Sequence, residues 1–427
     1  MTPIAGILLS LGLFLFSVAQ TNAKVCTLQP LGAGLDDTDQ VEAAISECGQ
    51  YGQVIFGAGD YNITRKMTWN LVSSQVDLYG YLSFIPDYQY WLNYNSTYRV
   101  VFIQDQASWF VVTGNDFIID AHGQGGIKGN GQPWWSYYAT GAQPRLDGDG
   151  RPIAFTLSHV QRGVVNNFHI DSPPFWCNTV ADSVDVVYDG MVCNATNTDT
   201  TYAGQNIVPN TDGIDTYRSD SVSLLNWDVT CGDDCLAIKG NTTNLYVQNV
   251  ICRGGNGIAF GSLGQYVDLP DNVENVVMEN LQLLRLPTNI QPNMGSGVYF
   301  KSWTATVNGT PPTGGGGGTG YVKDVVARNV YVDRVNVPMH LYQTNGGYAN
   351  DTPSYFQFSN LSFYNWTGTS LANKLADIEC SPNAPCPNMV FGDFDVTPPA
   401  GTTPSYVCVN VVSETGLPGP CNATGRA

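Results

Sequence analysis

The sequence is short of basic residues. Its 427 residues include 18 Lys and Arg against 36 Asp and Glu, a formal net charge of -18 at pH 7. Proteins that bind nucleic acids or anionic membranes need basic patches, so we expect neither as a partner. The acidic balance suits a protein that works in acid. A polyanionic substrate would gain nothing from long-range attraction, and individual cations would have to recognise it.

Charged side chains of both signs are also scarce. They make up 13% of the residues, whereas Gly (46) and Tyr (23) are abundant. Because Glu, Lys and Arg usually cover helix surfaces, this composition favours strands and turns. The one clear helical pattern is DDTDQVEAAISECG, residues 36–49, which has an acidic start, apolar residues at helical spacing and Gly49 as its stop.

Long apolar runs are missing after the N-terminus. Residues 4–18 form a short apolar run before a polar stretch that ends at Ala23, which predicts a signal peptide over 1–23. The run is short for a membrane anchor, the alternative interpretation. We expect a secreted monomer in which residues 24–427 form one domain. Acceptor sequences typical of N-glycosylation occur at Asn62, Asn95, Asn194, Asn241, Asn308, Asn350, Asn360, Asn365 and Asn422.

Metal-binding patterns of Cys and His are missing as well. The four histidines, His122, His159, His169 and His340, share no metal-ligand spacing and are interpreted as structural, so we expect no metal and no cofactor. Ten of the eleven cysteines form locally spaced pairs that predict disulfides in an exported protein, and Cys231 is left over as a small buried side chain. The predicted pairs are Cys26–Cys48, Cys177–Cys193, Cys235–Cys252, Cys380–Cys386 and Cys408–Cys421.

One pattern recurs through the middle of the chain: apolar, any, apolar, any, Asn, apolar, any, apolar. Alternation with a period of two predicts strands, and Asn tolerates the left-handed backbone of a tight turn between them. The spacings 249 - 226 = 23, 280 - 249 = 31 and 360 - 329 = 31 residues suit single coils of a solenoid. The sequence therefore predicts an all-β fold, a parallel β-helix whose end is capped by the helix over 36–49. The Asn residues of the repeat are Asn226, Asn249, Asn280, Asn329 and Asn360, with a looser copy at Asn167.

The glycine-rich segment 308–321 is interpreted as a flexible surface insertion, because the repeat resumes after it.

Two adjacent carboxylates, Asp233 and Asp234, interrupt a predicted buried strand in VTCGDDCLAIKG, residues 229–240. Asp212 precedes Asp233 by 21 residues, about one coil, so we expect all three on one face. Asn256 and Lys301 follow at further coil spacings and should line the same groove. Crowded carboxylates repel one another, so one should hold a proton and act as a general acid while ionised ones activate water. A glycosidic bond suits this chemistry.

A surface bend or a calcium site is the alternative interpretation of the adjacent Asp residues. Calcium would need a denser run of oxygen ligands in one loop, which this sequence lacks. By the alternation, the nearby Asp215 and Asp220 are interpreted as turn or surface residues.

Four ordered blocks, NTDGID, CGDDCLAIKG, GGNGIAFGSLGQY and GVYFKSW, resemble glycoside hydrolase family 28, the polygalacturonase-like pectin hydrolases. GGIKGNGQPWW, residues 125–135, resembles a further landmark of that family. The resemblance implies a right-handed parallel β-helix and hydrolysis with inversion, without a cofactor. It matches Asp233 to the general acid. It matches Asp212 and Asp234 to the carboxylates that activate water, and Asn210 to a sugar-binding residue.

Two positions depart from the polygalacturonase pattern. Asn256 stands where those enzymes carry an assisting His, and Tyr299 stands where they carry an Arg that helps hold a galacturonate carboxylate, while Lys301 is kept. We therefore expect one subsite that does not recognise a carboxylate, which argues against a plain endo-polygalacturonase. Rhamnogalacturonan-acting members also lack the His, whereas GSLGQY, with Gln265 and Tyr266, resembles the exo-acting members.

An aromatic stretch, YLSFIPDYQYWLNYNSTYR at 81–99, has two interpretations. Its side chains either wall off one end of the groove, which would admit only a chain terminus, or pack on the side of the β-helix. The residues concerned are Phe84, Tyr88, Tyr90, Trp91 and Tyr94. Tyr342 and Gln343 are further candidates for lining the groove. With Asn210, we expect Asn256, Tyr299, Lys301 and Tyr342 to bind the substrate.

We predict a secreted hydrolase that removes galacturonate or rhamnose from a chain end of a pectic polysaccharide or oligosaccharide. An endo-acting rhamnogalacturonase is the alternative within the same chemistry. β-helices also serve as lyases and as noncatalytic carbohydrate-binding proteins. A pectate lyase would need calcium and a basic residue that abstracts a proton, and we interpret the acidic cluster, with no Arg expected in the site, as evidence against a lyase.

Overall fold

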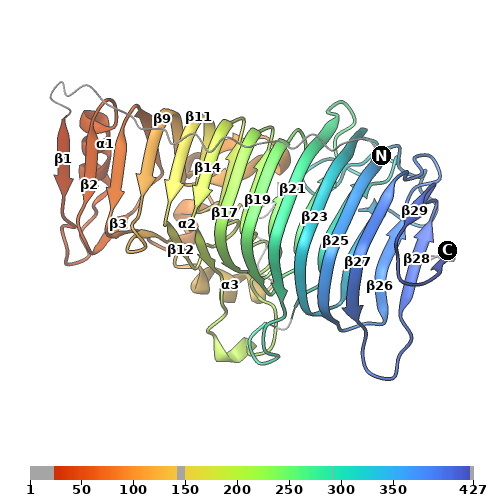
Figure 1. Cartoon of the computed structure of the whole chain (residues 1–427). Helices are drawn as coiled ribbons and strands as arrows, with labels where there is room; N and C mark the ends of the chain where they lie inside the picture. Colours follow the sequence, from red (N-terminus) through yellow and green to blue (C-terminus); the bar gives the residue numbers. More distant parts are fainter. Residues whose placement is uncertain (1–23, 142–149, 292, 424–427) are drawn as a thin grey trace.

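The computed structural model describes residues 24–141, 150–291 and 293–423. The predicted signal peptide, residues 1–23, lies outside the described residues. Figure 1 shows an elongated body in which strands of successive coils lie side by side, from β1 at one end to β28 and β29 at the other. In the described part of the chain, 28 strands join into one sheet, in which the paired strands run parallel. The predicted all-β, right-handed parallel β-helix is confirmed.

The strands that carry the candidate site form one face of the solenoid, here called the site sheet. Its strands pair in the order β13, β16, β18, β20, β22, β24, β26, β28. Their bounds are β13 (Asn178–Ala181), β16 (Ile214–Tyr217), β18 (Asp234–Ile238), β20 (Gly257–Leu263), β22 (Ser296–Trp303), β24 (Val337–Asn345), β26 (Lys374–Glu379) and β28 (Ser405–Val409).

Further strands close the other faces of each coil, and several of them bend where the repeat places its Asn. They are β9 (Phe110–Asp120), β11 (Phe155–Asn166), β14 (Val184–Asp189), β17 (Asp220–Thr230), β19 (Thr243–Arg253), β21 (Asp271–Leu284), β23 (Gly320–Val335), β25 (Gln357–Ser370) and β27 (Met389–Thr397). The shorter strands are β1 (Val25–Leu28), β2 (Gln53–Phe56), β3 (Asp60–Ile63), β4 (Met67–Val72), β5 (Gln75–Leu78), β6 (Tyr81–Phe84), β10 (Gly126–Lys128), β12 (His169–Asp171), β15 (Val192–Asn194), β29 (Glu414–Thr415) and β30 (Cys421–Asn422).

The apolar residues of the repeat point into the solenoid. In β17, Val222, Leu224, Trp227 and Val229 are at most 1% exposed. Each coil stacks these residues on those of the next, as at Leu224, which pairs with Val247 of β19. The core is therefore a continuous column that no single coil could bury alone.

The Asn residues of the repeat form a hydrogen-bonded ladder along the outside of the bends. Asn226 has a left-handed backbone (φ 56°), which turns the strand without breaking it. Each side-chain amide donates from Nδ2 to Oδ1 of the preceding Asn. The bonds are Asn249 to Asn226 (2.9 Å), Asn280 to Asn249 (3.0 Å), Asn329 to Asn280 (3.1 Å) and Asn365 to Asn329 (2.9 Å).

The last rung corrects the predicted repeat. The sequence pattern aligned Asn360 with Asn329, whereas the register pairs Ala327 with Phe363 and so places Asn365 above Asn329. Asn360 belongs to a second row of left-handed residues, in which its Nδ2 donates to Asp324 Oδ1 at 2.8 Å. Each coil has two polar residues with a left-handed backbone. The apolar pattern alone does not show which of the two corresponds to the Asn of the preceding coil.

The N-terminal end is covered as predicted. Helix α1 (Thr38–Cys48) ends at Gly49, whose N–H donates to Ile45 O. Its buried side Val41, Ala44 and Ile45 packs on the core, and Cys48 is joined to Cys26 of β1. All five predicted disulfides are confirmed, and Cys231 is a free, buried cysteine. No helix in the described ranges is both long and apolar enough to cross a membrane.

Most aromatic residues of the stretch 81–99 pack against the solenoid. Phe84 and Trp91 are fully buried, and Tyr88 lies 4.8 Å from Trp134 between ring centroids. These contacts belong to two helices that the sequence did not predict, α2 (Tyr88–Trp91) and α3 (Gly131–Ala139). Both are short and rich in aromatic residues, so neither shows a clear amphipathic pattern. The aromatic wall is therefore not formed by this stretch as a whole.

The next residues do leave the solenoid. We call residues 98–106 the strap: it contains β7 (Tyr98–Val101), the 3-10 turn η2 (Ile103–Asp105) and the start of β8 (Gln106–Ser108), which pairs antiparallel with β7. The glycine-rich segment 308–321 also differs from the prediction of a flexible loop. Gly314, Gly315 and Gly316 are buried, and the last two have φ values of 139° and 112° that favour glycine.

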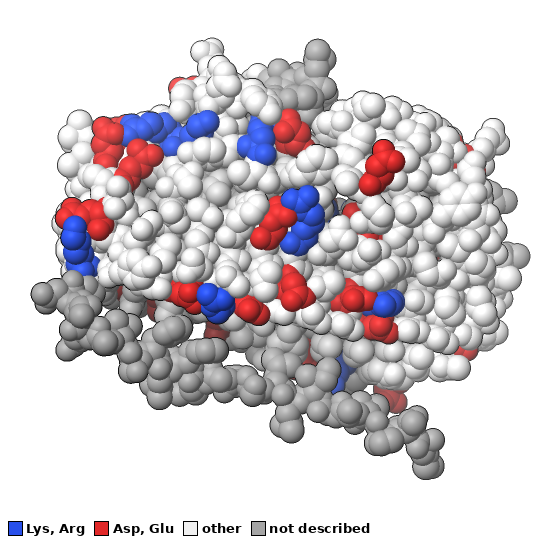
Figure 2. Space-filling view, turned by 90° about the horizontal axis from the view of Figure 1, so that it is seen from above, with Lys and Arg blue, Asp and Glu red and all other residues white. Residues whose placement is uncertain are grey.

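Charged residues are few on the face seen in Figure 2, and Lys and Arg there lie beside Asp or Glu. Among the described residues, surface ion pairs include Arg162 with Asp116 (2.6 Å) and Lys323 with Glu274 (2.7 Å). The surface basic residues are thus largely neutralised locally, which agrees with the expectation that recognition of an anion depends on single cations.

Candidate active site

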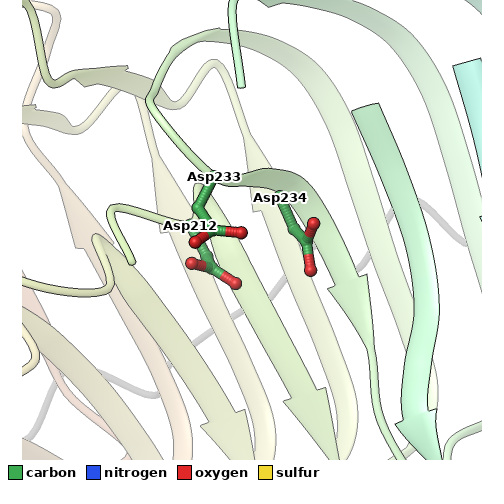
Figure 3. A group of neighbouring side chains, drawn as sticks. All are labelled: Asp212, Asp233 and Asp234. Atoms are coloured by element: carbon green, nitrogen blue, oxygen red, sulfur yellow. The ribbon is translucent and has the colours of Figure 1, made fainter. Parts of the chain in front are cut away.

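The three predicted carboxylates come together at the N-terminal edge of the site sheet. Asp212 lies just before β16, and Asp233 and Asp234 lie at the start of β18 on the next coil. Figure 3 shows the three carboxyl groups close together, and one oxygen of each lies within 4.8 Å of those of the other two. The two coils can approach this closely because Gly213 follows Asp212: a Cβ there would lie 2.4 Å from Cys235 O on β18.

Asp234 is held by a cation and a phenol. It is 2% exposed, its Oδ2 lies 3.2 Å from Lys301 Nζ, and its Oδ1 accepts a hydrogen bond from Tyr299 OH. Lys301 Nζ also donates to Tyr299 OH at 3.1 Å. Tyr299 is 5% exposed, so it serves Asp234 rather than forming an open sugar-binding surface. Burial and the carboxylates of Asp234 and Asp233 raise the pKa of this phenol well above its usual value.

Asp233 is half-buried, and the hydrogen bonds to its side chain come from amides. Asn256 Nδ2 donates to its Oδ1 at 2.8 Å, and the Asn210 backbone N–H donates to its Oδ2 at 3.0 Å. Asn293 Nδ2 in turn donates to Asn256 Oδ1 at 3.0 Å, which orients that amide. Burial and the neighbouring Asp234 raise the pKa of Asp233. Asn256 and Asn210 therefore position an acid in this structure, a role that their predicted sugar binding did not include.

Asp212 is the most enclosed of the three. It is 3% exposed, and its Oδ1 has no hydrogen-bond partner within the described residues. Burial raises its pKa well above the usual range, and Asp215 and Asp233 raise it further. A site with three crowded carboxyls thus holds protons at pH values where an exposed Asp has lost its own.

The three oxygens could in principle hold a metal ion, since they are near enough to share one. Two features fit protons better. Lys301 already supplies a positive charge to Asp234, and both oxygens of Asp233 accept hydrogen bonds from amides. A cation in this space would face Lys301, so the donor set does not fit a divalent ion well.

Asp215 corrects the sequence analysis. It is fully buried rather than a turn or surface residue, and its Oδ1 lies 3.2 Å from Lys239 Nζ. Burial raises its pKa to about 7 despite this ammonium. Asp220 is half-buried at the start of β17 and accepts a hydrogen bond from Asn244 Nδ2 at 2.7 Å.

The remaining predicted site residues separate into two groups. Tyr342 of β24 is half-buried and lies opposite Lys301 in the register, so it continues the row of outward residues beyond the carboxylates. Gln343 is 2% exposed and bonded to the backbone of Phe356 and Ser381, so it is structural. His340 lies beside Tyr342, with ring centroids 4.8 Å apart.

A pocket of about 170 Å³ has Asn210 in its lining. Its lining combines two aromatic rings with amide, hydroxyl and charged groups, as sugar-binding sites do. The lining residues are Arg99, Gln104, Asp105, Gln106, Gly150, Phe175, Trp176, Asn210, Pro312 and Thr313. Asn210 joins the pocket to the site, because its N–H is bonded to Asp233.

The strap crosses one side of this pocket. Phe175 and Trp176 precede β13 and form a small core with Val101, which anchors the strap at the N-terminal edge of the site sheet. Tyr266 follows β20, at the opposite edge, and its OH accepts a hydrogen bond from Gln104 N at 2.7 Å. The ring of Phe102 lies 5.7 Å from that of Tyr266. The strap is therefore tied down at both edges of the sheet.

Comparison with known proteins identifies the family. A family model described as glycosyl hydrolases family 28 matches residues 87–416. The chain is a family 28 glycosyl hydrolase. A protein of Aspergillus niger named as a galacturan 1,4-alpha-galacturonidase is 39% identical over 425 residues, which cover 94% of each chain. An alpha-L-rhamnosidase of the same species is 31% identical over 94% of this chain and 90% of its own. The fold is also that of an endo-xylogalacturonan hydrolase from Aspergillus tubingensis, with a TM-score of 0.77, 22% identity, and coverage of 94% of this chain and all of that one.

Membership in family 28 makes this chain a glycosidase of the pectin-degrading kind. The family resemblance seen in the sequence is thus confirmed. The structure also shows which groups contact the two residues that depart from the polygalacturonase pattern. Asn256 takes a place beside Asp233, and Tyr299 takes a place on Asp234, so both substituted positions touch the acid cluster.

The family 28 enzyme should be most stable in acid. Burial raises the pKa of Asp271 from 3.8 to about 6 and that of Asp215 to about 7. Between pH 4 and 7 the folded state then binds more protons than the unfolded chain, so the free energy of unfolding falls as pH rises. For Asp271 alone the loss is on the order of 3 kcal/mol. Carboxyls with lowered pKa values, such as Glu279, stabilise the folded state at higher pH, and this stabilisation is lost only as pH falls through their lowered pKa values.

Calorimetry from pH 4 to 8 tests this expectation. Tm should fall across the range, and Asp271→Asn should flatten the part between pH 4 and 6 because the amide does not titrate. A Tm that rises from pH 4 to 7 would contradict the prediction.

Proposed function

We propose that this enzyme is exported and hydrolyses the backbone of pectic polysaccharides with inversion, removing one sugar at a time from a chain end. The disulfides agree with an oxidising compartment. The observation that supports the chemistry best is the unequal bonding of the two adjacent carboxyls. Asp234 is paired with the ammonium of Lys301, whereas the hydrogen bonds to the Asp233 side chain come, among the described residues, from neutral amides.

These partners suggest the roles. Asp233 is half-buried and has a raised pKa, so it can carry a proton to the glycosidic oxygen. Asp234, paired with the ammonium of Lys301, accepts a proton from water, and Asp212 beside it helps to orient that water through its Oδ1, which has no partner among the described residues. The water oxygen forms a bond to the anomeric carbon as the bond to the leaving oxygen breaks. The proton from Asp233 goes to the oxygen of the leaving sugar, and the proton from water goes to the carboxylate of Asp234.

The pocket supports action at a chain end. The strap is anchored at Trp176 on one edge of the site sheet and at Tyr266 on the other, so it lies across the path that a polymer would follow along the sheet. Gln265 is bonded to the glycine-rich segment 308–321, since its Nε2 donates a hydrogen bond to Gly314 O at 2.9 Å. A pocket of about 170 Å³ is small beside the roughly 300 to 1,000 Å³ of sites for drug-sized ligands, which suits one sugar residue.

Digestion of galacturonate and rhamnogalacturonan oligomers labelled at the reducing end tests this function. Early products should be one unlabelled or one labelled monosaccharide together with an oligomer one residue shorter, and the label shows which end enters the pocket. The identity of the monosaccharide decides between galacturonate and rhamnose. Mixed oligomers at early times would support endo action, and an unsaturated product absorbing in the ultraviolet would indicate a lyase. Binding without any release would support a noncatalytic protein.

Opening the strap should change the product pattern. Tyr266→Ala removes both the hydrogen bond to Gln104 N and the ring contact with Phe102. We expect longer oligomers to appear among the early products, with little change in Tm. Tyr331→Ala, at an exposed tyrosine on β23, is the matched control and should keep the wild-type pattern. Monosaccharide alone from Tyr266→Ala would show that the strap does not close the site.

A further inference from the structure

Arg151 is a buried cation between the pocket and the acid cluster. It is 2% exposed, and its guanidinium carbon lies 5.1 Å from the ring centroid of Phe175, which lines the pocket. Its Nη1 donates to Pro174 O and Pro209 O, each at 3.0 Å. Its Nη2 donates to Asn210 Oδ1 at 3.0 Å. The roles assigned above include none for this arginine.

A buried guanidinium at this place calls for a physical reason. Removing a charge from water is costly, and apolar side chains of similar volume often stabilise a protein as well or better. Arg has five N–H donors in a rigid plane and no acceptor, so it can fix the direction of several acceptors at once. Two of the acceptors here are backbone carbonyls, whereas the third is a side-chain amide that can rotate. The amide of Asn210 is therefore the group whose orientation depends on Arg151.

The other side of this amide faces the acid. Rotation by half a turn exchanges the oxygen and the nitrogen of a primary amide, which have nearly the same size. Because Arg151 has no acceptor, the oxygen of Asn210 stays on its side, and Nδ2 donates to Asp233 Oδ2 at 3.3 Å. The backbone N–H of Asn210 donates to the same oxygen at 3.0 Å. Oδ2 of Asp233 therefore accepts two hydrogen bonds from one residue.

These bonds determine which oxygen of Asp233 carries the proton. A carboxyl oxygen that accepts two hydrogen bonds has no lone pair left for a proton. Oδ1 accepts one hydrogen bond, from Asn256 Nδ2 at 2.8 Å, so the proton resides on Oδ1. If the amide of Asn210 turned round, its oxygen would lie beside Oδ2. A proton on Oδ2 would then be held between two protein oxygens and withheld from the leaving oxygen of the substrate.

We propose that Arg151 is a positioning residue: by fixing the amide of Asn210, it keeps the acid proton on Oδ1 of Asp233, available for transfer to the glycosidic oxygen. The inference rests on the proposed function, in which Asp233 is the general acid. It assigns no substrate contact to Arg151.

Arg151→Met tests the proposal, because it removes the donor to Asn210 and keeps an unbranched side chain beside Phe175. We expect kcat on natural oligomers to fall roughly tenfold, the factor that corresponds to the loss of one hydrogen bond. A substrate whose leaving group is an acidic phenol needs no proton, so its hydrolysis should change little. Arg328→Met, at an exposed arginine on β23, is the matched control and should leave both rates unchanged.

Substitutions of Asn210 give the test its sign. Asn210→Gly removes the amide oxygen that would hold the proton, and glycine readily adopts the left-handed backbone of this position (φ 57°), so the backbone N–H still reaches Oδ2. The double variant of Arg151→Met with Asn210→Gly should therefore have a higher kcat on natural oligomers than Arg151→Met alone.

Asn210→Asp examines the same point while Arg151 stays in place. One oxygen of the new carboxylate pairs with the arginine, and the other accepts the proton of Asp233. This variant has the shape of the wild type, yet its kcat on natural oligomers should fall further than that of Asn210→Gly. Because Asn210 also lines the pocket, all rates are compared at saturating substrate.

Two results would overturn the proposal. One is an equal loss on both substrates in Arg151→Met, which a merely structural role of the arginine predicts. The other is a double variant that is slower than Arg151→Met alone. If Arg151→Met folds poorly, the Asn210 variants decide, and Asn210→Gly slower than Asn210→Asp would overturn the proposal. A wild-type enzyme that releases no sugar would show that the proposed function fails, and the inference with it. Wild-type release together with an overturning result means that only this inference fails.

Discussion

Asp233→Asn is expected to lower kcat by roughly 10²- to 10⁴-fold, the usual contribution of a general acid. Asn has nearly the same shape and can accept the hydrogen bonds from Asn256 Nδ2 or Asn210 N, but it has no proton to give to the leaving oxygen. Its Tm should equal or exceed that of the wild type, because one of three mutually repelling carboxyls is removed.

The leaving group separates proton donation from other causes of inactivity. A substrate with an acidic phenol as leaving group needs no protonation, so its hydrolysis should fall much less in Asp233→Asn than that of a natural oligomer. Asp395→Asn, at an exposed carboxyl on β27, is the control and should leave both rates unchanged. Full activity of Asp233→Asn on natural oligomers would remove Asp233 from the role of acid.

Lys301→Met should be the most destabilising single change at the site. Asp234 is 2% exposed, and without Lys301 its charge would be buried with only Tyr299 to compensate it. Breaking a buried pair in this way typically costs about 3 to 5 kcal/mol of unfolding free energy. Hydrolysis should also be lost, since Lys301 no longer holds the carboxyl of Asp234, the proposed base.

Two companion variants make this prediction specific. Asp234→Asn combined with Lys301→Met should recover most of the stability and none of the activity, because no buried charge remains. Lys323→Met breaks a surface pair with Glu274 and should cost no more than about 1 kcal/mol. Denaturant unfolding measures all three. A Lys301→Met variant as stable as Lys323→Met would show that the buried pair contributes little.

The sequence predicted the convergence of Asp212, Asp233 and Asp234 because a solenoid converts regular spacing into proximity. Residues about one coil apart lie on adjacent strands whatever the loops do, so counting 21 residues was enough. The same reasoning placed Asn256 and Lys301 at the cluster. What spacing does not give is the bonding partner, and Tyr299, named only as a substrate-binding residue, proved to be a buried donor to Asp234.

Other features depend on contacts that no periodicity records. Gln104 and Tyr266 are 162 residues apart, and each lies in an irregular segment, so their hydrogen bond could not be anticipated from alternation. Asp215 was misjudged because alternation distinguishes inward from outward but not exposed from covered. It does point outward on the site sheet, yet it is completely buried there beside Lys239.

The Asn ladder sets where this protein can change during evolution. Each amide from Asn226 to Asn365 must stand directly over the previous one, so added or lost residues at these bends would break a row of hydrogen bonds in register. Within the described residues, the edges of the site sheet carry no such row of Asn side chains, and the strap and the segment 308–321 both lie there. Lineages could therefore exchange these peripheral segments, and with them the choice of substrate terminus, while the scaffold and its acids are inherited intact.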